Sequence, residues 1–258
     1  MNQNTTVKVF YDNFKGKLLE DFLKPNIRIA NAIRRSLLRI PCSTKSILDL
    51  GFGLGWSSYE FARHFPQAKI EAYDISKELY ETARSLFQLP NLNYNNLDLT
   101  IEFPKGNYDV IILLDVFEHI PKAARTQFYN NISDALNPNG RVIMTCPTVD
   151  HQNYLRKNNP EGLQPVDEDV DLVILSEFSK NIQAEISLFE NLNIWNPKDY
   201  LLAEISRYND QSLENLQYLP SISLIDFYQK YELLKNSKEL LPYLPKLTFK
   251  QKIKSILH

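Results

Sequence analysis

Two aspartates and three closely spaced glycines are the residues of this 258-residue chain whose types and spacing are best suited to hold a ligand. Asp49 lies in an apolar run that leads directly into glycines at positions 51, 53 and 55, and Asp74 closes a second apolar run after an intervening helical pattern. A glycine turn between a strand and a helix brings a ligand close to backbone N–H groups, and an acid at the end of the next strand can accept ribose hydroxyls. This stretch therefore predicts a nucleotide-like ligand.

The elements that must position these residues alternate between strands and helices. Near-continuous apolar runs predict strands that are buried on both faces of a sheet, and amphipathic segments between them predict helices. Such alternation requires an α/β fold with a parallel, doubly wound sheet. The expected strands cover residues 46–50, 69–73, 92–95, 108–114 and 141–145, and the expected helices 56–64, 77–87 and 122–136.

The pattern changes after Pro147. We expect a polar loop over residues 148–167 and a helix over 169–180. Two β-like runs follow at 184–195 and 200–207, and the short link between them (NPKD) suits an antiparallel pair but not a parallel crossover. The sheet should therefore be mostly parallel, with an antiparallel last strand.

Helical periodicity also precedes the first strand. Residues 10–40 carry apolar positions at three- and four-residue spacing on both sides of Pro25, which indicates two helices separated by the proline. Arg28 and three further arginines give this segment a basic side. We interpret it as a solvated helix face, with contact to an anionic substrate group as the less favoured alternative.

The composition excludes several classes of function. The chain is 43% hydrophobic and 23% charged, with a formal net charge of −2, so it has no overall basic field to hold a nucleic-acid backbone. Cys42 and Cys146 are too few for a disulfide framework, and their separation suits no zinc motif. The N-terminus has no signal-peptide pattern, and no apolar run approaches the roughly 18 residues of a membrane span. We expect a cytoplasmic protein that uses neither nucleic acid nor a metal; its oligomeric state stays open.

From residue 45 to about residue 208 the chain resembles the class I S-adenosylmethionine-dependent methyltransferases. The most specific part is the run Leu48-Asp49-Leu50-Gly51-Phe52-Gly53-Leu54-Gly55. Its third glycine comes one residue earlier than in the G-x-G-x-x-G fingerprint of NAD-binding enzymes, and an acid precedes its first glycine by two positions. The resemblance implies a Rossmann-like, seven-stranded methyltransferase sheet and S-adenosyl-L-methionine as the cofactor.

The same resemblance implies roles for the residues of the glycine turn and the following strand. Asp49 would hold the methionine part of the cofactor, directly or through water. Gly51, Gly53 and Gly55, together with Phe52, would let the backbone pass beneath it. Asp74 would accept both ribose hydroxyls.

Further cofactor contacts are implied later in the chain. Ile75 would cover one face of the adenine, and Leu97 and Asp98 match the family's adenine pocket, with simple turn chemistry as the alternative for Asp98. Asp115 and Val116 would lie beside the sulfonium, although Asp115 alternatively caps the following helix.

The acceptor side offers two histidines. Methyl transfer from a sulfonium is an in-line displacement, in which an alcohol or amine acceptor also needs a base. His151, expected in the loop on the acceptor side, is our first candidate. His119 is the second, in a run Glu118-His119-Ile120-Pro121 that resembles the EH-x-P turn of small-molecule, quinone and lipid methyltransferases; a structural role is its alternative.

Three weaker site candidates complete the set. Tyr11 would cover the cofactor from the N-terminal side, and Tyr154 and Arg156 would orient the acceptor, Arg156 by gripping a carboxylate or phosphate. Packing of the loop and a solvated charge are equally acceptable interpretations of the last two.

The sequence thus predicts a methyltransferase that acts on a small-molecule, glycan or lipid-precursor acceptor, at oxygen and with a histidine base. We expect N-terminal helices over residues 1–44 to cap the site, a cofactor-binding domain over 45–208, and a helical extension over 209–258. The basic end of that extension, KLTFKQKIKSILH, leaves contact with a membrane surface or a partner open. The alternatives are an NAD-type oxidoreductase and a non-catalytic methyltransferase-like subunit. The acceptor itself does not follow from the sequence.

Overall fold

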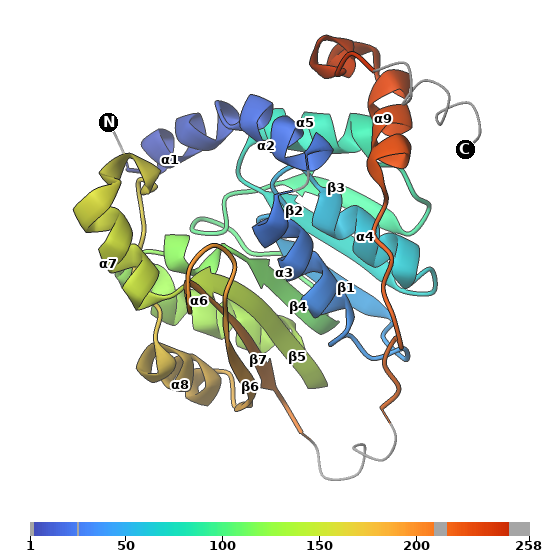
Figure 1. The fold of residues 1–258 in the computed structure, drawn as a ribbon. Coiled ribbons are helices and arrows are strands. Elements are labelled where there is room, and N and C mark those ends of the chain that lie inside the picture. Colours follow the sequence, from blue (N-terminus) through green and yellow to red (C-terminus); the bar gives the residue numbers. More distant parts are fainter. Residues whose placement is uncertain (1–2, 25, 209–215, 248–258) are drawn as a thin grey trace.

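A mixed seven-stranded sheet in the order β3-β2-β1-β4-β5-β7-β6 forms the centre of the protein (Figure 1). The structure is a computed structural model, and it describes residues 3–24, 26–208 and 216–247. Strands β1 to β5 are parallel, whereas β7 is antiparallel to both β5 and β6, so the predicted sheet is confirmed. The strands are β1 (Ser46–Leu50), β2 (Lys69–Asp74), β3 (Leu92–Asn96), β4 (Tyr108–Leu114), β5 (Leu136–Pro147), β6 (Glu185–Leu192) and β7 (Tyr200–Ser206).

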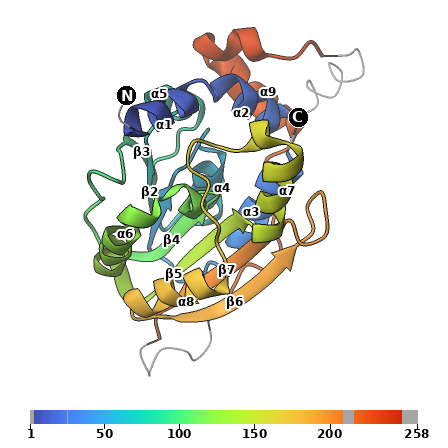
Figure 2. The same cartoon turned by 90° about the vertical axis from the view of Figure 1, so that its left-hand side faces the viewer.

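Helices cover both faces of the sheet (Figures 1 and 2). Successive residues of a strand point to opposite faces. In β4, Val110 and Ile112 therefore join one core layer, and Ile111 and Leu113 join the other. All four side chains are fully buried, which explains why β4 is a continuous apolar run. The first layer includes α3 (Ile27–Leu37), α4 (Trp56–His64) and α5 (Lys77–Leu86), and the second includes α6 (Lys122–Ala135) and α8 (Leu172–Asn181).

Short polar side chains mark the starts of five of the described helices. Asn26, Ser76, Thr148, Asp171 and Asp226 each accept a hydrogen bond from a backbone N–H in the first turn of the helix that follows. Such caps satisfy N–H groups that have no partner within the helix. The sequence therefore specifies where these helices begin independently of their packing.

The segment after Pro147 differs from the prediction. The polar loop expected over residues 148–167 contains the helix α7 (Val149–Asn158), followed by a 3-10 turn at Pro160–Gly162. Gln152 is the one fully buried residue of α7, so the helix carries no apolar stripe that a periodicity could detect. His151 thus lies in the first turn of a helix and not in a loop.

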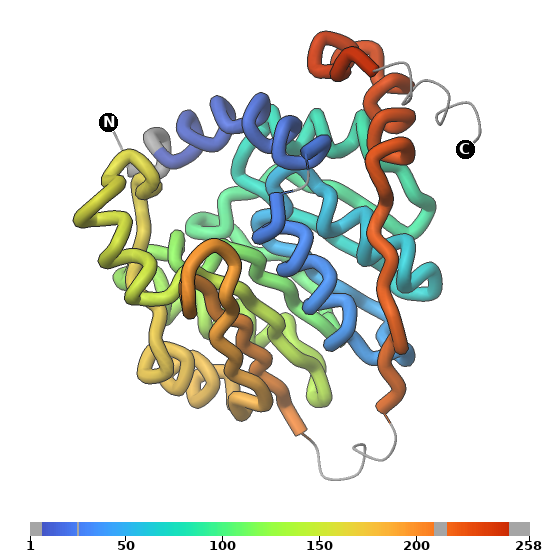
Figure 3. Tube along the Cα trace, viewed as in Figure 1, coloured from blue at the N-terminus to red at the C-terminus, as the bar shows by residue number. Residues whose placement is uncertain are grey.

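The N-terminal and C-terminal segments pack against each other. α1 (Gln3–Asp12) and α2 (Lys15–Leu23) lie along one end of the molecule. As predicted, the helical segment is interrupted between Leu23, the end of α2, and Ile27, the start of α3. The trace in Figure 3 shows the C-terminal segment passing α4 before it forms α9 (Phe227–Asn236) and a 3-10 helix at Lys238–Tyr243. Lys230 of α9 is buried and donates to the carbonyl of Phe22 at 2.8 Å, which ties α9 to α2.

Two further expectations concern the C-terminal tail and membrane-spanning segments. Most of the predicted basic tail, residues 248–258, lies outside the described residues. Within the described ranges, no helix combines the length and the apolar character that crossing a membrane requires.

Candidate functional site

A cavity of about 230 Å³ lies at the carboxyl ends of β1, β2 and β4. Ligands bind at this edge of parallel sheets because the loops that follow the strands converge there. The glycine turn after β1 and the residues that follow β2 and β4 form one side of the cavity. The helices α1, α2 and α3 form the other side, through Tyr11, Leu18 and Arg28 among others.

All three glycines of the turn have left-handed backbone conformations. The φ angle is +69° at Gly51, +57° at Gly53 and +92° at Gly55. A Cβ atom at position 51 would lie 2.5 Å from Cγ2 of Val116, so any side chain there would displace Val116 from the cavity wall. At Gly53 the nearest atom would be 3.8 Å away, on Leu18, so there the backbone conformation alone requires glycine. The turn is closed toward β4 and open toward α2.

Asp74 is held in place by two backbone donors. The N–H of Gly53 donates to one carboxylate oxygen at 2.8 Å, and the N–H of Ser76 donates to the other at 2.9 Å. Burial raises the pKa of Asp74 to about 7, although both bonds act in the opposite direction. Each carboxylate oxygen can accept more than one hydrogen bond. Asp74 therefore retains acceptor capacity on the cavity side.

Asp49 lies outside the cavity lining. Its carboxylate accepts hydrogen bonds from the hydroxyls of Ser57 and Ser58, at 2.8 and 2.6 Å, and burial raises its pKa to about 6. Both serines belong to the first turn of α4, and Ser57 itself lines the cavity. Asp49 thus positions the start of α4 against the glycine turn, and its effect on a ligand would pass through Ser57.

The structure brings most of the predicted cofactor residues around one cavity. Leu97 does not line the cavity but helps to position Asp74, because its N–H donates to the backbone carbonyl of Asp74 at 2.9 Å. Asp98 accepts from the N–H and the hydroxyl of Thr100, at 2.9 and 2.6 Å, so it makes the turn contacts of the alternative interpretation and also lines the cavity. The predicted residues in the lining are Gly51, Phe52, Gly53, Asp74, Ile75, Asp98, Asp115 and Val116; those outside it are Asp49, Gly55 and Leu97.

His119 lines the cavity with a defined protonation pattern. Its Nδ1 lies 2.6 Å from the backbone carbonyl of Val166, and because a carbonyl only accepts, Nδ1 carries the proton. Burial lowers the pKa of His119, so the neutral ring is favoured. Its Nε2, 3.8 Å from Oε1 of Glu118, then holds the lone pair. A neutral imidazole of this tautomer is suited to take up a proton.

The other predicted acceptor residues lie beside the cavity, on α7. The ring of His151 is 5.5 Å from the ring of Tyr200, and burial lowers the pKa of His151. Tyr154 is exposed, and Arg156 donates to Asp169 at 2.7 Å. None of these three α7 residues belongs to the lining of the described cavity.

Tyr11 joins α1 to the segment that follows α7. Its hydroxyl donates to Oε1 of Gln164 at 2.5 Å, and both side chains line the cavity. Burial raises the pKa of Tyr11 far above its ordinary value, so the hydroxyl stays protonated. Gln164 was not among the predicted site residues, because a single glutamine in a polar segment carries no motif.

Arg28 corrects the interpretation of the basic side as a solvated face. It lines the cavity, forms an ion pair with Asp115 and lies over the ring of Tyr200, 5.6 Å from its centre. Arg28 follows the cap Asn26 by two residues, and a cation in the first turn of a helix opposes the helix dipole. The ion pair with Asp115 offsets this unfavourable position. Asp115, in turn, does not cap the following helix.

Comparison with known proteins relates this site to methyl transfer. The model of a methyltransferase domain matches residues 47–140. A malonyl-[acyl-carrier protein] O-methyltransferase of Halalkalibacterium halodurans is 34% identical over 106 residues, which cover 39% of this chain and 38% of that protein. Malonyl-[acyl-carrier protein] O-methyltransferase 1 of Ilyobacter polytropus is 27% identical over 172 residues, 66% of this chain and 59% of that protein. The chain thus spans less than two thirds of the length of either relative.

A solved structure supports the same relationship at the level of the fold. The DhpI–SAH complex matches with a TM-score of 0.60 and 19% identity, covering 78% of this chain and 95% of that one. The domain match starts in β1, includes the glycine turn and the strand-end acids, and ends within β5. Together with the parallel sheet closed by an antiparallel strand, these matches support a class I S-adenosylmethionine-dependent methyltransferase.

Proposed function

We propose that this protein transfers a methyl group from S-adenosyl-L-methionine to an oxygen of a small-molecule, glycan or lipid-precursor acceptor, with a histidine as the base. The observation that carries this proposal is that the glycine turn, Asp74 and His119 line one cavity. The names of the two O-methyltransferases and of the DhpI–SAH complex support this chemistry and this cofactor.

The cavity residues fit the parts of the cofactor. S-adenosyl-L-methionine supplies a methyl group that is already activated on a sulfonium. Asp74, whose two oxygens are oriented by backbone donors, would accept the ribose hydroxyls. Ile75 and Asp98 would enclose the adenine, and Ser57, held by Asp49, would contact the methionine part. Asp115 would lie next to the sulfonium.

His119 replaces His151 as our candidate base because it lines the cavity. As the acceptor oxygen forms its bond to the methyl carbon, the bond from that carbon to sulfur would break and leave its electron pair on sulfur. The proton of the acceptor would pass to Nε2 of His119 while Nδ1–H stays bonded to Val166. The resulting imidazolium would be stabilised by Asp167, whose Oδ1 lies 3.6 Å from Nδ1. The enclosing helices α1, α2 and α3 would exclude water during the transfer.

We also propose the three-part organisation with boundaries at residues 44 and 208. Tyr11, Leu18 and Arg28 in the cavity lining support a capping role for the N-terminal helices. The buried contact from Lys230 to the carbonyl of Phe22 supports a C-terminal extension that steadies this cap. In this arrangement the cofactor-binding domain supplies the donor site, and the N-terminal segment supplies part of the acceptor site.

Binding calorimetry tests the cofactor assignment. We expect S-adenosyl-L-methionine and its demethylated product to bind, and NAD⁺ not to bind. Asp74→Ala should weaken cofactor binding about 10- to 100-fold, as expected for the loss of hydrogen bonds to a charged group. Asp134→Ala, an exposed acid on α6, is the matched control. A calorimetric binding signal with NAD⁺ and none with S-adenosyl-L-methionine would favour the oxidoreductase alternative.

The base assignment needs an acceptor, which a metabolite extract can supply. Mass spectrometry should find a component that gains one methylene when protein and cofactor are added. With that acceptor, His119→Gln should lower kcat about 100- to 10,000-fold without changing cofactor affinity, whereas His151→Gln should have a small effect. A larger loss in His151→Gln would reverse the assignment. Cofactor binding without turnover of any extract would support the non-catalytic alternative.

A further inference from the structure

Arg28 is the one lysine or arginine in the lining of the described cavity. Its side chain is 23% exposed and comes from the first turn of α3, while the glycine turn, Asp74 and Val116 lie on other walls. A guanidinium carries several N–H donors in a rigid fork, and its planar face can rest on an aromatic ring. Arg28 has such a support in Tyr200. The position of Arg28 is therefore that of a preoriented anion receptor.

The present partner of Arg28 is held in an unusual backbone conformation. Asp115 has a φ of +55°, in the left-handed region that non-glycine residues seldom occupy. The N–H of Asp115 donates to the carbonyl of Thr145 at 2.9 Å, and the hydroxyl of Thr145 donates to Oδ1 of Asp115 at 2.9 Å. These bonds hold the strained residue so that its carboxylate reaches Arg28 at the cavity wall. Strained residues that their surroundings hold in place concentrate at ligand sites and switches.

A purely structural role would not require this pair. The other end of α3 is already attached to the sheet, because Arg35 donates to Glu190 of β6 and Arg39 donates to Glu204 of β7. The pair of Arg28 and Asp115 is also partly exposed, on both sides of the contact. A ligand needs access to a contact that it replaces, and the 23% and 16% exposure of these two side chains provides that access. The contact is thus easier to explain as one that a ligand can exchange.

We propose that Arg28 binds an anionic group of the methyl acceptor, a carboxylate or a phosphate, and that this group takes the place of the Asp115 carboxylate. This inference rests on the proposed function and narrows its substrate class to anionic acceptors. Arg28 is then a specificity-determining residue that orients the acceptor beside the cofactor. While the acceptor is absent, Asp115 keeps the guanidinium neutralised and aimed at the cavity.

The test uses the full chain saturated with S-adenosylhomocysteine and three probes: malonate, inorganic phosphate and the neutral ester dimethyl malonate. Calorimetry should detect at least one of the two anions and no binding of the ester, and the anion that binds distinguishes carboxylate from phosphate. Arg28→Gln should weaken anion binding about 10- to 100-fold, whereas Arg34→Gln, an exposed arginine of the same helix, should not. Failure of both anions to bind, or equal binding by Arg28→Gln, would overturn the inference.

A second variant distinguishes an ion pair that the acceptor anion replaces from an ion pair that only stabilises the fold, which we call a latch. Asp115→Asn removes the competing anion, so it should strengthen binding of the anionic probe about 3- to 10-fold, by the loss of an internal ion pair. A latch predicts instead a lower melting temperature and unchanged anion affinity. Arg28→Lys, which keeps the charge without the fork, should bind the anion with intermediate strength. S-adenosylhomocysteine binding is measured in each variant, and its absence from the wild type would contradict the proposed function and not the anion site.

Discussion

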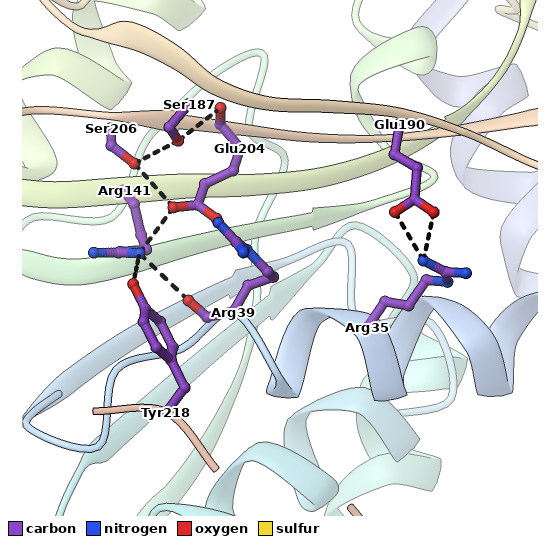
Figure 4. A network of polar contacts seen from close by, with 8 residues as sticks. All are labelled: Arg35, Arg39, Arg141, Ser187, Glu190, Glu204, Ser206 and Tyr218. Carbon is purple, nitrogen blue, oxygen red and sulfur yellow. Dashed lines mark hydrogen bonds and ion pairs between the residues drawn. The ribbon is translucent and has the colours of Figure 1, made fainter. Parts of the chain in front are cut away.

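The two ends of α3 carry arginine–carboxylate contacts that differ in how completely their polar atoms are paired. In the first turn, Arg28 meets Asp115 at the wall of a cavity. Just beyond the last turn, Nε of Arg39 donates to Glu204 at 2.6 Å, and Nη1 of Arg141 donates to the other oxygen of the same carboxylate at 2.8 Å (Figure 4). One helix therefore joins an exchangeable ion pair to a buried network.

In the buried network Glu204 and Arg141 each have a counter-charge and a further hydrogen bond. Glu204 is 1% exposed and also accepts from the hydroxyl of Ser206 at 3.1 Å, and Arg141 donates to the hydroxyl of Tyr218 at 3.0 Å. The network ties α3, β5, β7 and the C-terminal segment together. Such complete pairing is what makes the burial of charge tolerable.

At the cavity end the buried acids are less well compensated. Burial raises the pKa of Asp49 to about 6, of Asp74 to about 7 and of Glu118 to about 8. Within the described part of the chain, Oε2 of Glu118 is buried without a hydrogen-bond partner. Incomplete pairing costs stability but leaves polar groups for a ligand. This difference supports our proposal that the cavity end of α3 serves binding, whereas the other end serves stability.

The largest expected effect tests the stabilising end. Glu204→Ala leaves Arg141 buried without its counter-charge, which should lower the free energy of unfolding by about 3–5 kcal/mol. The melting temperature should fall by about 10 °C for a chain of this size. Thermal and urea unfolding measure the change, and calorimetry should show cofactor affinity within about threefold of wild type. A strong loss of cofactor affinity in the folded variant would contradict the separation of the two ends.

Much of the sheet could be predicted because its signals are local. The structure has β1, α4 and β4 with the predicted bounds, since each apolar or helical run is enclosed by acids, glycines or prolines. β5 is longer than predicted and begins at Leu136. Its N-P-N-G segment reads as a turn, yet Leu136 pairs with Tyr108 across an irregularity in the register. A turn signal inside a bulged strand cannot be distinguished from a loop without knowledge of the partner strand.

The donor side of the site was predictable for the same reason, whereas the arginines were not. The glycine turn and Asp74 form a motif within 24 consecutive residues that enclose α4. Arg39 and Glu204, by contrast, are 165 residues apart, and helical periodicity places Arg28, Arg34, Arg35 and Arg39 in one basic segment. The structure gives them different surroundings: Arg28 lines the cavity, Arg35 and Arg39 pair with strand acids, and Arg34 is exposed. Only tertiary contacts distinguish these positions.

A smaller effect, dependent on pH, is expected at the cavity end. The pKa of Glu118 is about 8 in the folded protein against an ordinary value of 4.5, so between these values the folded state binds more protons than the unfolded state. Stability that involves this group therefore falls as the pH rises from about 4.5 to about 8. Glu118→Gln cannot ionise and should lack this fall. Relative to wild type it should gain on the order of 1–2 kcal/mol between pH 6 and pH 9, because the wild-type protein must then bury a charge.

Urea unfolding at pH 6, 7.5 and 9 measures this difference. Glu177→Gln, an exposed position on α8, is the matched control and should follow the wild type at every pH. If the difference in stability between Glu118→Gln and wild type is constant across this range, Glu118 does not retain a proton in the folded state up to about pH 8.

The smallest effect is expected for an ion pair on the same helix that has good geometry but little burial. Nη1 of Arg35 donates to both carboxylate oxygens of Glu190, at 2.9 and 2.8 Å, yet the two side chains are 41% and 42% exposed (Figure 4). Glu190→Gln should therefore change the free energy of unfolding by only about 0.2–1 kcal/mol, and less in high salt. Arg35 and Arg39 both attach the C-terminal end of α3 to neighbouring strands, β6 and β7. Comparing this variant with Glu204→Ala therefore separates the effect of buried charge from the effect of attaching the helix. A loss as large as that of Glu204→Ala would mean that attachment of α3, and not the burial of unpaired charge, determines the stability of this end.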